Sequence, residues 1–233
     1  MAPQMAPPPK IAIIAALPRE ISGLTQGTPP DSELRRRGIH LHRSSGAVIV
    51  AAGMGAGRVT LAVEAALRDP GIELLVSAGL AGACSPEIAA GDAFEASTVV
   101  DAKTGERFDC ATSAAQYILV TTEAIAGPRE KARLLATYNA GFVDMEAATV
   151  ARLAAAKGLR FRAIKGISDA HDFEMKSMSQ FADARGHFRT AAFALHTAFH
   201  PGSWKPAMRL GRESNRALAK LWTELRSLIA QTN

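Results

Sequence analysis

The segment from Phe142 to Asp172 constrains the fold of this chain most, because an acidic residue, a helix, a strand and a second acidic residue follow one another in it. Glu146 begins the helical pattern, and Asp169 directly follows an apolar run of strand length. Gly158 stands between them, where a helix C-cap glycine is expected. A helix packed back on a sheet can bring both acids to one edge, where open α/β sheets bind ligands. The spacing is equally compatible with two other interpretations: Glu146 as a first-turn charge favoured by the helix dipole, and Asp169 as a turn residue.

Strands and helices alternate along the rest of the chain as well. Lys10–Leu17 has the composition of a fully buried strand, and Pro18 then begins a short helix that places Glu20 just past the strand. The glycines of Gly53–Gly57 predict a turn from a strand into a helix, and those of Gly79–Gly82 predict a second turn at a strand end. The alternation predicts an α/β fold with helices on both faces of the sheet. The other expected elements are a hairpin over 40–44 and 47–52, strands over 72–78, 94–101 and 117–122, and helices over 128–138, 181–200 and 208–230.

Size and composition predict one large domain over residues 10–233, preceded by a disordered Pro-rich tail over residues 1–9. The hydrophobic fraction of 48% is enough for a sizeable core. No apolar run approaches the roughly 20 residues of a membrane span, and the N-terminus lacks the pattern of a secretory signal. Cys84 and Cys110 lack the spacing typical of a metal site, so we expect two reduced thiols in a cytoplasmic protein.

The net charge of +5 favours an anionic partner, but the few aromatic residues are not interleaved with the basic ones, so we expect no nucleic-acid partner. The expected last helix has an apolar stripe and a basic polar face. This pattern has two interpretations: the stripe docks on the core, which is the commoner case, or the helix makes a peripheral contact with a membrane. The stripe consists of Leu218, Leu221, Trp222, Leu225, Leu228 and Ile229.

Three acidic residues follow strand ends or begin helices: Glu20, Glu146 and Asp169. In a shared site, one carboxyl group can activate water, one can hold hydroxyl groups and one can protonate a leaving group. Cleavage of a glycosidic bond needs a base for water and an acid for the departing group. The pattern therefore favours glycosidic chemistry.

Six short motifs, in order, resemble those of the nucleoside phosphorylase and nucleosidase superfamily, and most closely its methylthioadenosine/S-adenosylhomocysteine nucleosidase branch. The resemblance covers most of the chain from Lys10 to Asp172. Each motif is weak alone, and the shared order makes the signal strong. The motifs are Ile11-Ala-Ile-Ile-Ala-Ala-Leu-Pro-Arg-Glu20, Gly53-Met-Gly-Ala-Gly-Arg-Val59, Ser77-Ala-Gly-Leu-Ala-Gly82, Gly91-Asp92, Val143-Asp-Met-Glu-Ala147 and Ile167-Ser-Asp169.

The resemblance implies catalytic roles for two of the acids. Glu20 matches the residue that orients and deprotonates the attacking water, and Asp169 matches the general acid that gives a proton to purine N7. Ser168 would support Asp169. Glu146 matches the ligand of the ribose hydroxyls, with Met145 packed under the sugar. An acid that keeps its proton at neutral pH needs desolvation, which a strand end beneath helices can supply.

The resemblance also implies the architecture and the partners. It implies a three-layer α/β/α sandwich with a mixed central sheet, in which Gly79 and Val143 would line the sugar and the base. It implies no metal and no redox cofactor. Relatives are commonly dimers or hexamers, so we expect a homo-oligomer that acts on a small-molecule nucleoside.

The same resemblance favours water over phosphate as the nucleophile. Phosphorylase relatives hold phosphate with an Arg and a Ser near the Gly-Leu-Ala-Gly motif, where this chain has Ser77 and Leu80. Loss of a bidentate Arg weakens an anion site severely, and Glu20 would repel phosphate. Arg58 keeps phosphorolysis open as an alternative, although a solvated helix charge is the preferred interpretation. A non-catalytic nucleoside-binding protein is the third hypothesis.

Several departures from the nucleosidase branch concern the substrate. That branch has a Ser where Leu80 stands, and an aromatic residue that stacks on adenine where this chain has Glu123–Ala126. From His171 onward, the chain looks like the hopanoid-associated nucleosidase/phosphorylase branch. The expected substrate is therefore a 5′-substituted adenosine, namely methylthioadenosine, S-adenosylhomocysteine or an adenosylated lipid such as adenosylhopane, from which adenine is released.

Overall fold

The computed structural model describes residues 10–44, 46–112, 115–174 and 204–232. The expected helix over 181–200 and the expected N-terminal tail lie outside these residues. Nine strands form one sheet among the described residues. The strands are β1 (Ile11–Ala15), β2 (His40–Ser44), β3 (Ala47–Ala51), β4 (Leu74–Ala83), β5 (Ala93–Asp101), β6 (Arg107–Asp109), β7 (Tyr117–Thr121), β8 (Ala140–Asp144) and β9 (Arg160–Asp169).

Helices follow most of the strands, as the alternation in the sequence predicts. Pro18 and Pro128 stand at the first positions of their helices, where the missing N–H costs nothing. Helix α5 begins after Glu146, which is its N-cap, and Gly158 beyond its end has a φ of 65°. The helices are α1 (Pro18–Ile21), α2 (Ser32–Arg36), α3 (Ala56–Ala66), α4 (Pro128–Tyr138), α5 (Ala147–Ala156) and α7 (Trp204–Thr232).

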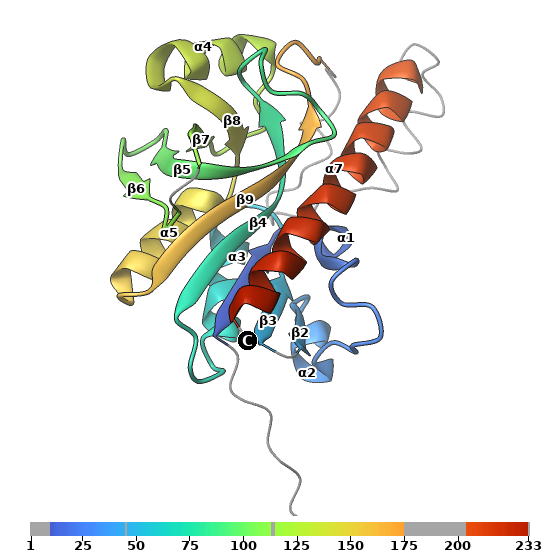
Figure 1. The fold of residues 1–233 in the computed structure, drawn as a ribbon, viewed down its shortest axis with the longest axis vertical. Helices are drawn as coiled ribbons and strands as arrows, with labels where there is room; N and C mark the ends of the chain where they lie inside the picture. Colours follow the sequence, from blue (N-terminus) through green and yellow to red (C-terminus); the bar gives the residue numbers. More distant parts are fainter. Residues whose placement is uncertain (1–9, 45, 113–114, 175–203, 233) are drawn as a thin grey trace, which may run out of the picture.

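The sheet is mixed, as expected. Its strand order is β2-β3-β1-β4-β8-β7-β5-β6, and β9 pairs with both β4 and β5. β1 runs parallel to β3 and β4, whereas β8 runs antiparallel to β4 and parallel to β7. β9 is parallel to β4 and antiparallel to β5. The carboxyl ends of β1, β3, β8 and β9 consequently lie around one region of the molecule (Figure 1).

Two buried clusters cover the two faces of the sheet. Side chains alternate along β1, so that Ala12 and Ile14 join the cluster with α3 and α5, while Ile11 and Ile13 join the cluster with α7. Figure 1 shows α7 lying across β4 and β9. The three-layer α/β/α arrangement expected from the sequence is therefore present.

One local prediction is wrong: the segment Gly79–Gly82 is strand and not a turn. β4 continues through it to Ala83, because its pairing with β9 extends as far as Gly82 and Asp169. The glycines here do not reverse the chain. They allow side chains from other elements to come close to the strand. The turn expected at Gly53–Gly57 is present, with φ of 115° at Gly53 and 81° at Gly55.

Helix α7 docks its apolar stripe on the sheet. Leu218, Leu221, Leu225 and Leu228 are buried, and Trp222 Nε1 donates a hydrogen bond of 2.6 Å to the carbonyl oxygen of Glu20. The stripe thus belongs to the core, which is the commoner of its two interpretations. Membrane contact by this helix stays a prediction. Among the described residues, no helix combines the length and apolar character needed to cross a bilayer.

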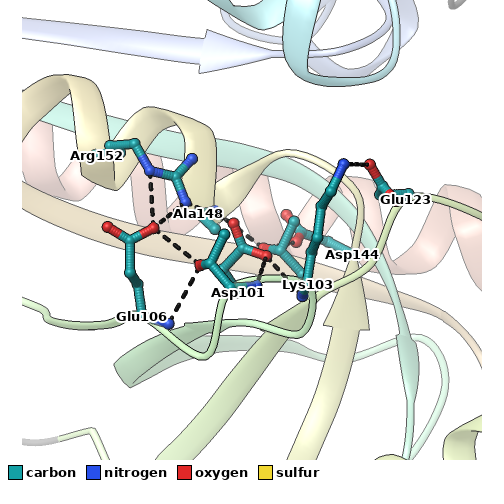
Figure 2. A network of polar contacts seen from close by, with 9 residues as sticks. Asp101, Lys103, Glu106, Glu123, Asp144, Ala148 and Arg152 are labelled. Atoms are coloured by element: carbon teal, nitrogen blue, oxygen red, sulfur yellow. Dashed lines mark hydrogen bonds and ion pairs between the residues drawn. The ribbon is translucent and has the colours of Figure 1, made fainter.

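A polar network ties α5 to the β5–β6 hairpin on the far side of the same sheet (Figure 2). The guanidinium of Arg152 binds Asp101 at 2.6 Å and Glu106 at 2.5 Å. The hydrogen bond from the Arg152 guanidinium holds the pKa of the Glu106 carboxyl group below its usual range. The network helps to fix α5, whose N-cap residue, Glu146, is part of the site described next.

Candidate active site

A cavity of about 650 Å³ opens at the carboxyl ends of the strands. Glu20, Glu146 and Asp169 all lie on its wall, although they are far apart in the sequence. Met145, Val143 and Ser168 also line it, as expected for a site that these motifs share. The remaining wall comes from Ala16–Arg19, Gly38, His40, Ala51–Met54, Leu80–Gly82, Thr122, Ala124–Ala126, Lys131, Asp144, Ala207, Leu210, Gly211 and Ser214.

The carboxylate of Glu20 is buried, with 5% of the residue exposed, and it is held by backbone N–H groups. Oε2 accepts hydrogen bonds from Ala16 at 3.1 Å and Leu17 at 2.8 Å, and Oε1 accepts one from Leu80 at 3.0 Å. A carboxylate has about four acceptor positions. Three are occupied, so one remains to bind a water molecule in the cavity.

Gly79 lies behind Glu20 and supports it. Gly79 is not one of the residues that line the cavity, and its contact with the sugar stays a prediction. A Cβ on Gly79 would lie 3.1 Å from the carboxylate atoms of Glu20, and the φ of 131° disfavours any side chain. Glycine at this position therefore leaves room for the buried carboxylate.

Glu146 stands at the end of β8, in a half-buried position before α5. Its Oε1 accepts a hydrogen bond of 3.0 Å from the backbone N–H of Gly55, which is 91 residues away in the sequence. Burial, and after it the nearby carboxylate of Asp144, raise the pKa of Glu146 to about 7. Lys165 and the Gly55 N–H act in the opposite direction. Glu146 can thus accept hydrogen bonds from a ligand when ionised and donate one when protonated.

A buried ion pair lies beneath Glu146. Lys165 Nζ is 2.8 Å from Asp144 Oδ2, and both side chains are almost completely inaccessible, at 1% and 0% exposed. Lys165 also donates to Ser77 Oγ at 2.9 Å. Asp144 accepts from the Thr121 hydroxyl at 2.7 Å and from the N–H of Ala147 at 2.9 Å. Every polar atom in this network has a partner, so it fixes the strand end that carries Glu146.

Asp169 ends β9 at the other side of the cavity. One of its oxygens forms a hydrogen bond with Ser168 Oγ, and the single hydroxyl hydrogen of Ser168 is shared with the carbonyl oxygen of Ala81 at 3.1 Å. The other oxygen contacts the ammonium of Lys131, a residue of α4. Ser168 is therefore placed to orient Asp169, and its supporting role in catalysis stays a prediction.

Strand β4 sets the spacing between the two ends of the site. Leu80 binds Glu20, and Gly82 faces Asp169 two residues further along the same strand. At a rise of about 3.3 Å per residue, these two backbone positions are roughly 7 Å apart. One nucleoside-sized ligand can span such a distance.

The rest of the wall is largely apolar. Val143 belongs to β8, and Met145 directly follows this strand. Ala124, Ile125 and Ala126 belong to the segment after β7. Where the sequence lacks an aromatic residue, the structure provides aliphatic side chains. A flat base bound here would pack on aliphatic groups.

The anion-binding residues considered from the sequence are engaged elsewhere. Arg58 donates to the carbonyl oxygens of Ala52 and of Gly38, the latter at 2.7 Å. Ser77 is completely buried and receives Lys165. Arg19 and His40 are the basic side chains of the cavity wall besides Lys131. Among the described residues, no cluster of three or more His, Cys, Asp or Glu could hold a metal ion.

Three functional candidates were missed by the sequence analysis: Lys131, Asp144 and Lys165. Lys131 lies in a helix whose other charges are at least partly exposed, and Lys165 lies in the buried middle of β9. A charged residue in the middle of a strand expected to be buried was the available signal for Lys165, because a buried charge requires a partner. Asp144 was visible inside the Val-Asp-Met-Glu motif but received no role.

The raised pKa of Glu146 predicts a pH-dependent stability. A carboxyl group whose pKa is about 7 in the folded chain and 4.5 otherwise stabilises the fold fully below pH 4.5 and loses this contribution as the pH rises through 7. Glu146→Gln should remove this loss, which we expect to be on the order of 2 kcal/mol. Urea unfolding at pH 5 and pH 8 measures it. Glu33→Gln, at an exposed position, is the control, and equal pH slopes for Glu146→Gln and the unmodified chain would contradict the prediction.

Comparison with known families gives a match over most of the chain. The model of the phosphorylase superfamily matches residues 10–117 and 113–199. A comparison with curated protein sequences finds no significant match.

Solved structures with the same fold include two nucleosidases and a futalosine hydrolase, all at low sequence identity. Arabidopsis thaliana 5′-methylthioadenosine nucleosidase has a TM-score of 0.71 and 16% identity, with 97% of each chain covered. Helicobacter pylori 5′-methylthioadenosine/S-adenosylhomocysteine nucleosidase has a TM-score of 0.68 and 14% identity, over 96% of this chain and 98% of that one. Futalosine hydrolase of Helicobacter pylori has a TM-score of 0.60 and 18% identity, over 81% and 96%. These similarities establish the fold.

Proposed function

Because this chain belongs to the phosphorylase superfamily, we propose that it hydrolyses the N-glycosidic bond of a 5′-substituted adenosine and releases adenine. The observation that carries this proposal is the meeting of Glu20, Glu146 and Asp169 on the wall of one cavity. A relative with the fold alone would have no physical reason to bring three carboxyl groups from three strand ends together.

The residues divide the reaction between the two ends of the cavity. At one end, the free acceptor position of Glu20 binds a water molecule and takes its proton as the oxygen attacks C1′ of the ribose. The C1′–N9 bond breaks, its electron pair goes to the purine, and Asp169 gives a proton to purine N7. Glu146 accepts hydrogen bonds from the ribose hydroxyls between the two ends. The products are adenine and the 5-substituted ribose.

Water is the favoured nucleophile because the expected phosphate ligands are occupied. Arg58 is bound to two backbone carbonyls, and Ser77 is bound to Lys165. The buried carboxylate of Glu20 stands where the nucleophile would bind and repels an anion. Arg19 is the cation that keeps phosphorolysis as the alternative, since it is exposed and lines the cavity beside Glu20.

The candidate substrates differ only in the group on the 5′ carbon of the ribose. Leu210 and Gly211 of α7 line the cavity, so the last helix contributes to its wall with small and aliphatic residues. Methylthioadenosine, S-adenosylhomocysteine and an adenosylated lipid are the candidates. An apolar wall favours the thioether and the lipid over the charged amino-acid group of S-adenosylhomocysteine.

A panel of 5′-substituted adenosines, assayed with and without inorganic phosphate, tests the function. We expect adenine release and free ribose product without phosphate, and a loss of release of about 10³-fold in Asp169→Asn, which removes the acid. Ribose 1-phosphate formed only with phosphate would replace hydrolysis by phosphorolysis. Binding of nucleosides without release of base by the folded protein would indicate a non-catalytic binding protein.

Three further predictions concern the partners and the compartment. We expect a homo-oligomer, a cytoplasmic location and, in the second interpretation of α7, contact with a membrane surface. The free and buried thiols of Cys84 and Cys110 are consistent with a reducing compartment.

A further inference from the structure

Lys131 is a buried lysine whose ammonium reaches the wall of the cavity. Only 1% of the residue is exposed, although it lies in the charged helix α4. Its Nζ contacts Asp169 and donates a hydrogen bond of 2.8 Å to the carbonyl oxygen of Ala170. Burying a charged lysine is costly unless partners compensate for the lost water. Because this cost is accepted beside Asp169, the role of Lys131 is to be sought in the chemistry of the site, since packing and solubility do not require a buried charge.

The contact with an ammonium group favours the carboxylate form of Asp169. One oxygen of Asp169 contacts Lys131 Nζ, and the other forms a hydrogen bond with Ser168 Oγ. In the carboxylate form, Asp169 has no proton of its own to give. The general acid proposed above must therefore receive a proton before it can protonate a purine.

The surroundings leave Asp169 as the acidic partner of Lys131. Burial raises the pKa of the Cys84 thiol to about 12, so the sulfur nearby stays neutral. Glu130, the neighbour of Lys131 in α4, is paired with Arg133 at 2.6 Å. Among the described residues, Asp169 is the carboxylate that Lys131 contacts directly.

Gly82 provides the space for the pair. A Cβ on Gly82 would lie 2.9 Å from Lys131 Cε and 3.0 Å from Asp169 Oδ2. The first contact is closer than real Cβ atoms make and the second is at the tight limit, so a side chain at this position would push the end of the lysine aside. The strand is thus shaped around the contact between the two charged groups.

We propose that Lys131 stores the proton that Asp169 passes to the leaving base, a role that rests on the function proposed above. The ammonium transfers one proton to Asp169, which gives a neutral amine and a carboxylic acid. The acid protonates purine N7 as the C1′–N9 bond breaks, and it returns to a carboxylate. The proton that Glu20 takes from water then leaves to solvent, and the amine of Lys131 regains one from solvent. Lys131 acts through Asp169 and is therefore a positioning residue that also holds the proton.

Two substitutions at Lys131 separate proton storage from charge pairing. Lys131→Met removes the ammonium group, so Asp169 must take its proton from solvent. Carboxyl groups hold protons only at lower pH than ammonium groups do, so protonated Asp169 should be available mainly at low pH. We expect adenine release by this variant to fall about 100-fold at pH 7.5 and to recover to within about 10-fold at pH 5. Lys131→Arg keeps the charge, but a guanidinium does not give up a proton, so release should fall about 100-fold at both pH values.

If the ion pair is purely structural, the two variants should rank in the opposite order of activity. In that case Lys131→Arg would retain activity better than Lys131→Met, and the pH profile would keep its shape; either result overturns the proposal. Gly82→Ala, which displaces the pair without changing its chemistry, should also move activity to lower pH and serves if a Lys131 variant does not fold. Lys157→Met, at an exposed lysine, is the matched control. Absence of base release from the unmodified protein would reject the proposed function itself, whereas release with an unchanged profile in the variants rejects only the role of Lys131.

Discussion

Glu20→Gln is expected to lower the rate of adenine release by about 10³-fold, because an amide cannot take a proton from the attacking water. Both carboxylate oxygens of Glu20 accept hydrogen bonds from backbone N–H groups. In the variant, the NH₂ group of Gln replaces one of these oxygens, so two donors would face each other there. We therefore expect a loss of stability of about 1–3 kcal/mol as well. Initial rates at saturating substrate and urea unfolding measure the two effects separately.

The control for this variant is Glu33→Gln, which makes the same chemical change at an exposed position of α2. It should leave both the rate and the stability unchanged. If Glu20→Gln is folded and releases adenine at more than about a tenth of the original rate, Glu20 is not the base.

Lys165→Met is expected to destabilise the fold by about 3–5 kcal/mol, because it leaves the carboxylate of Asp144 buried without its counter-charge. The variant would still fill the space of the lysine stem, so lost packing is a small part of the effect. Urea unfolding near neutral pH measures the loss. Lys157→Met removes an exposed charge instead and should change stability by less than about 0.5 kcal/mol.

The double variant Asp144→Asn with Lys165→Met tests the cause of that loss. Asn keeps an oxygen for the hydroxyl of Thr121 and carries no charge, so the double variant should be more stable than Lys165→Met alone. Strictly additive losses would show that the two side chains do not act as a pair.

Local patterns were sufficient to predict the alternating fold and the three acidic residues at strand ends: apolar runs, helical spacing, and polar residues that follow a strand. The mixed sheet came from the family resemblance alone. Lys131 could not be predicted in this way, because its burial depends on Asp169, which is 38 residues away in the sequence. Gly79–Gly82 was assigned to a turn for a related reason. The need for glycine there comes from Glu20 and Lys131, which approach the strand from other elements.

The contact between α7 and the start of the chain has a consequence for the order of events during synthesis. Trp222 holds the backbone of Glu20 by a hydrogen bond across 202 residues of sequence, and its ring fills the place of a side chain at Gly23. A ribosome makes the first of these residues long before the last. Until residue 222 has left the exit tunnel and docked, helix α1, which carries Glu20, lacks this anchor, so the nascent polypeptide is expected to stay inactive until α7 has emerged.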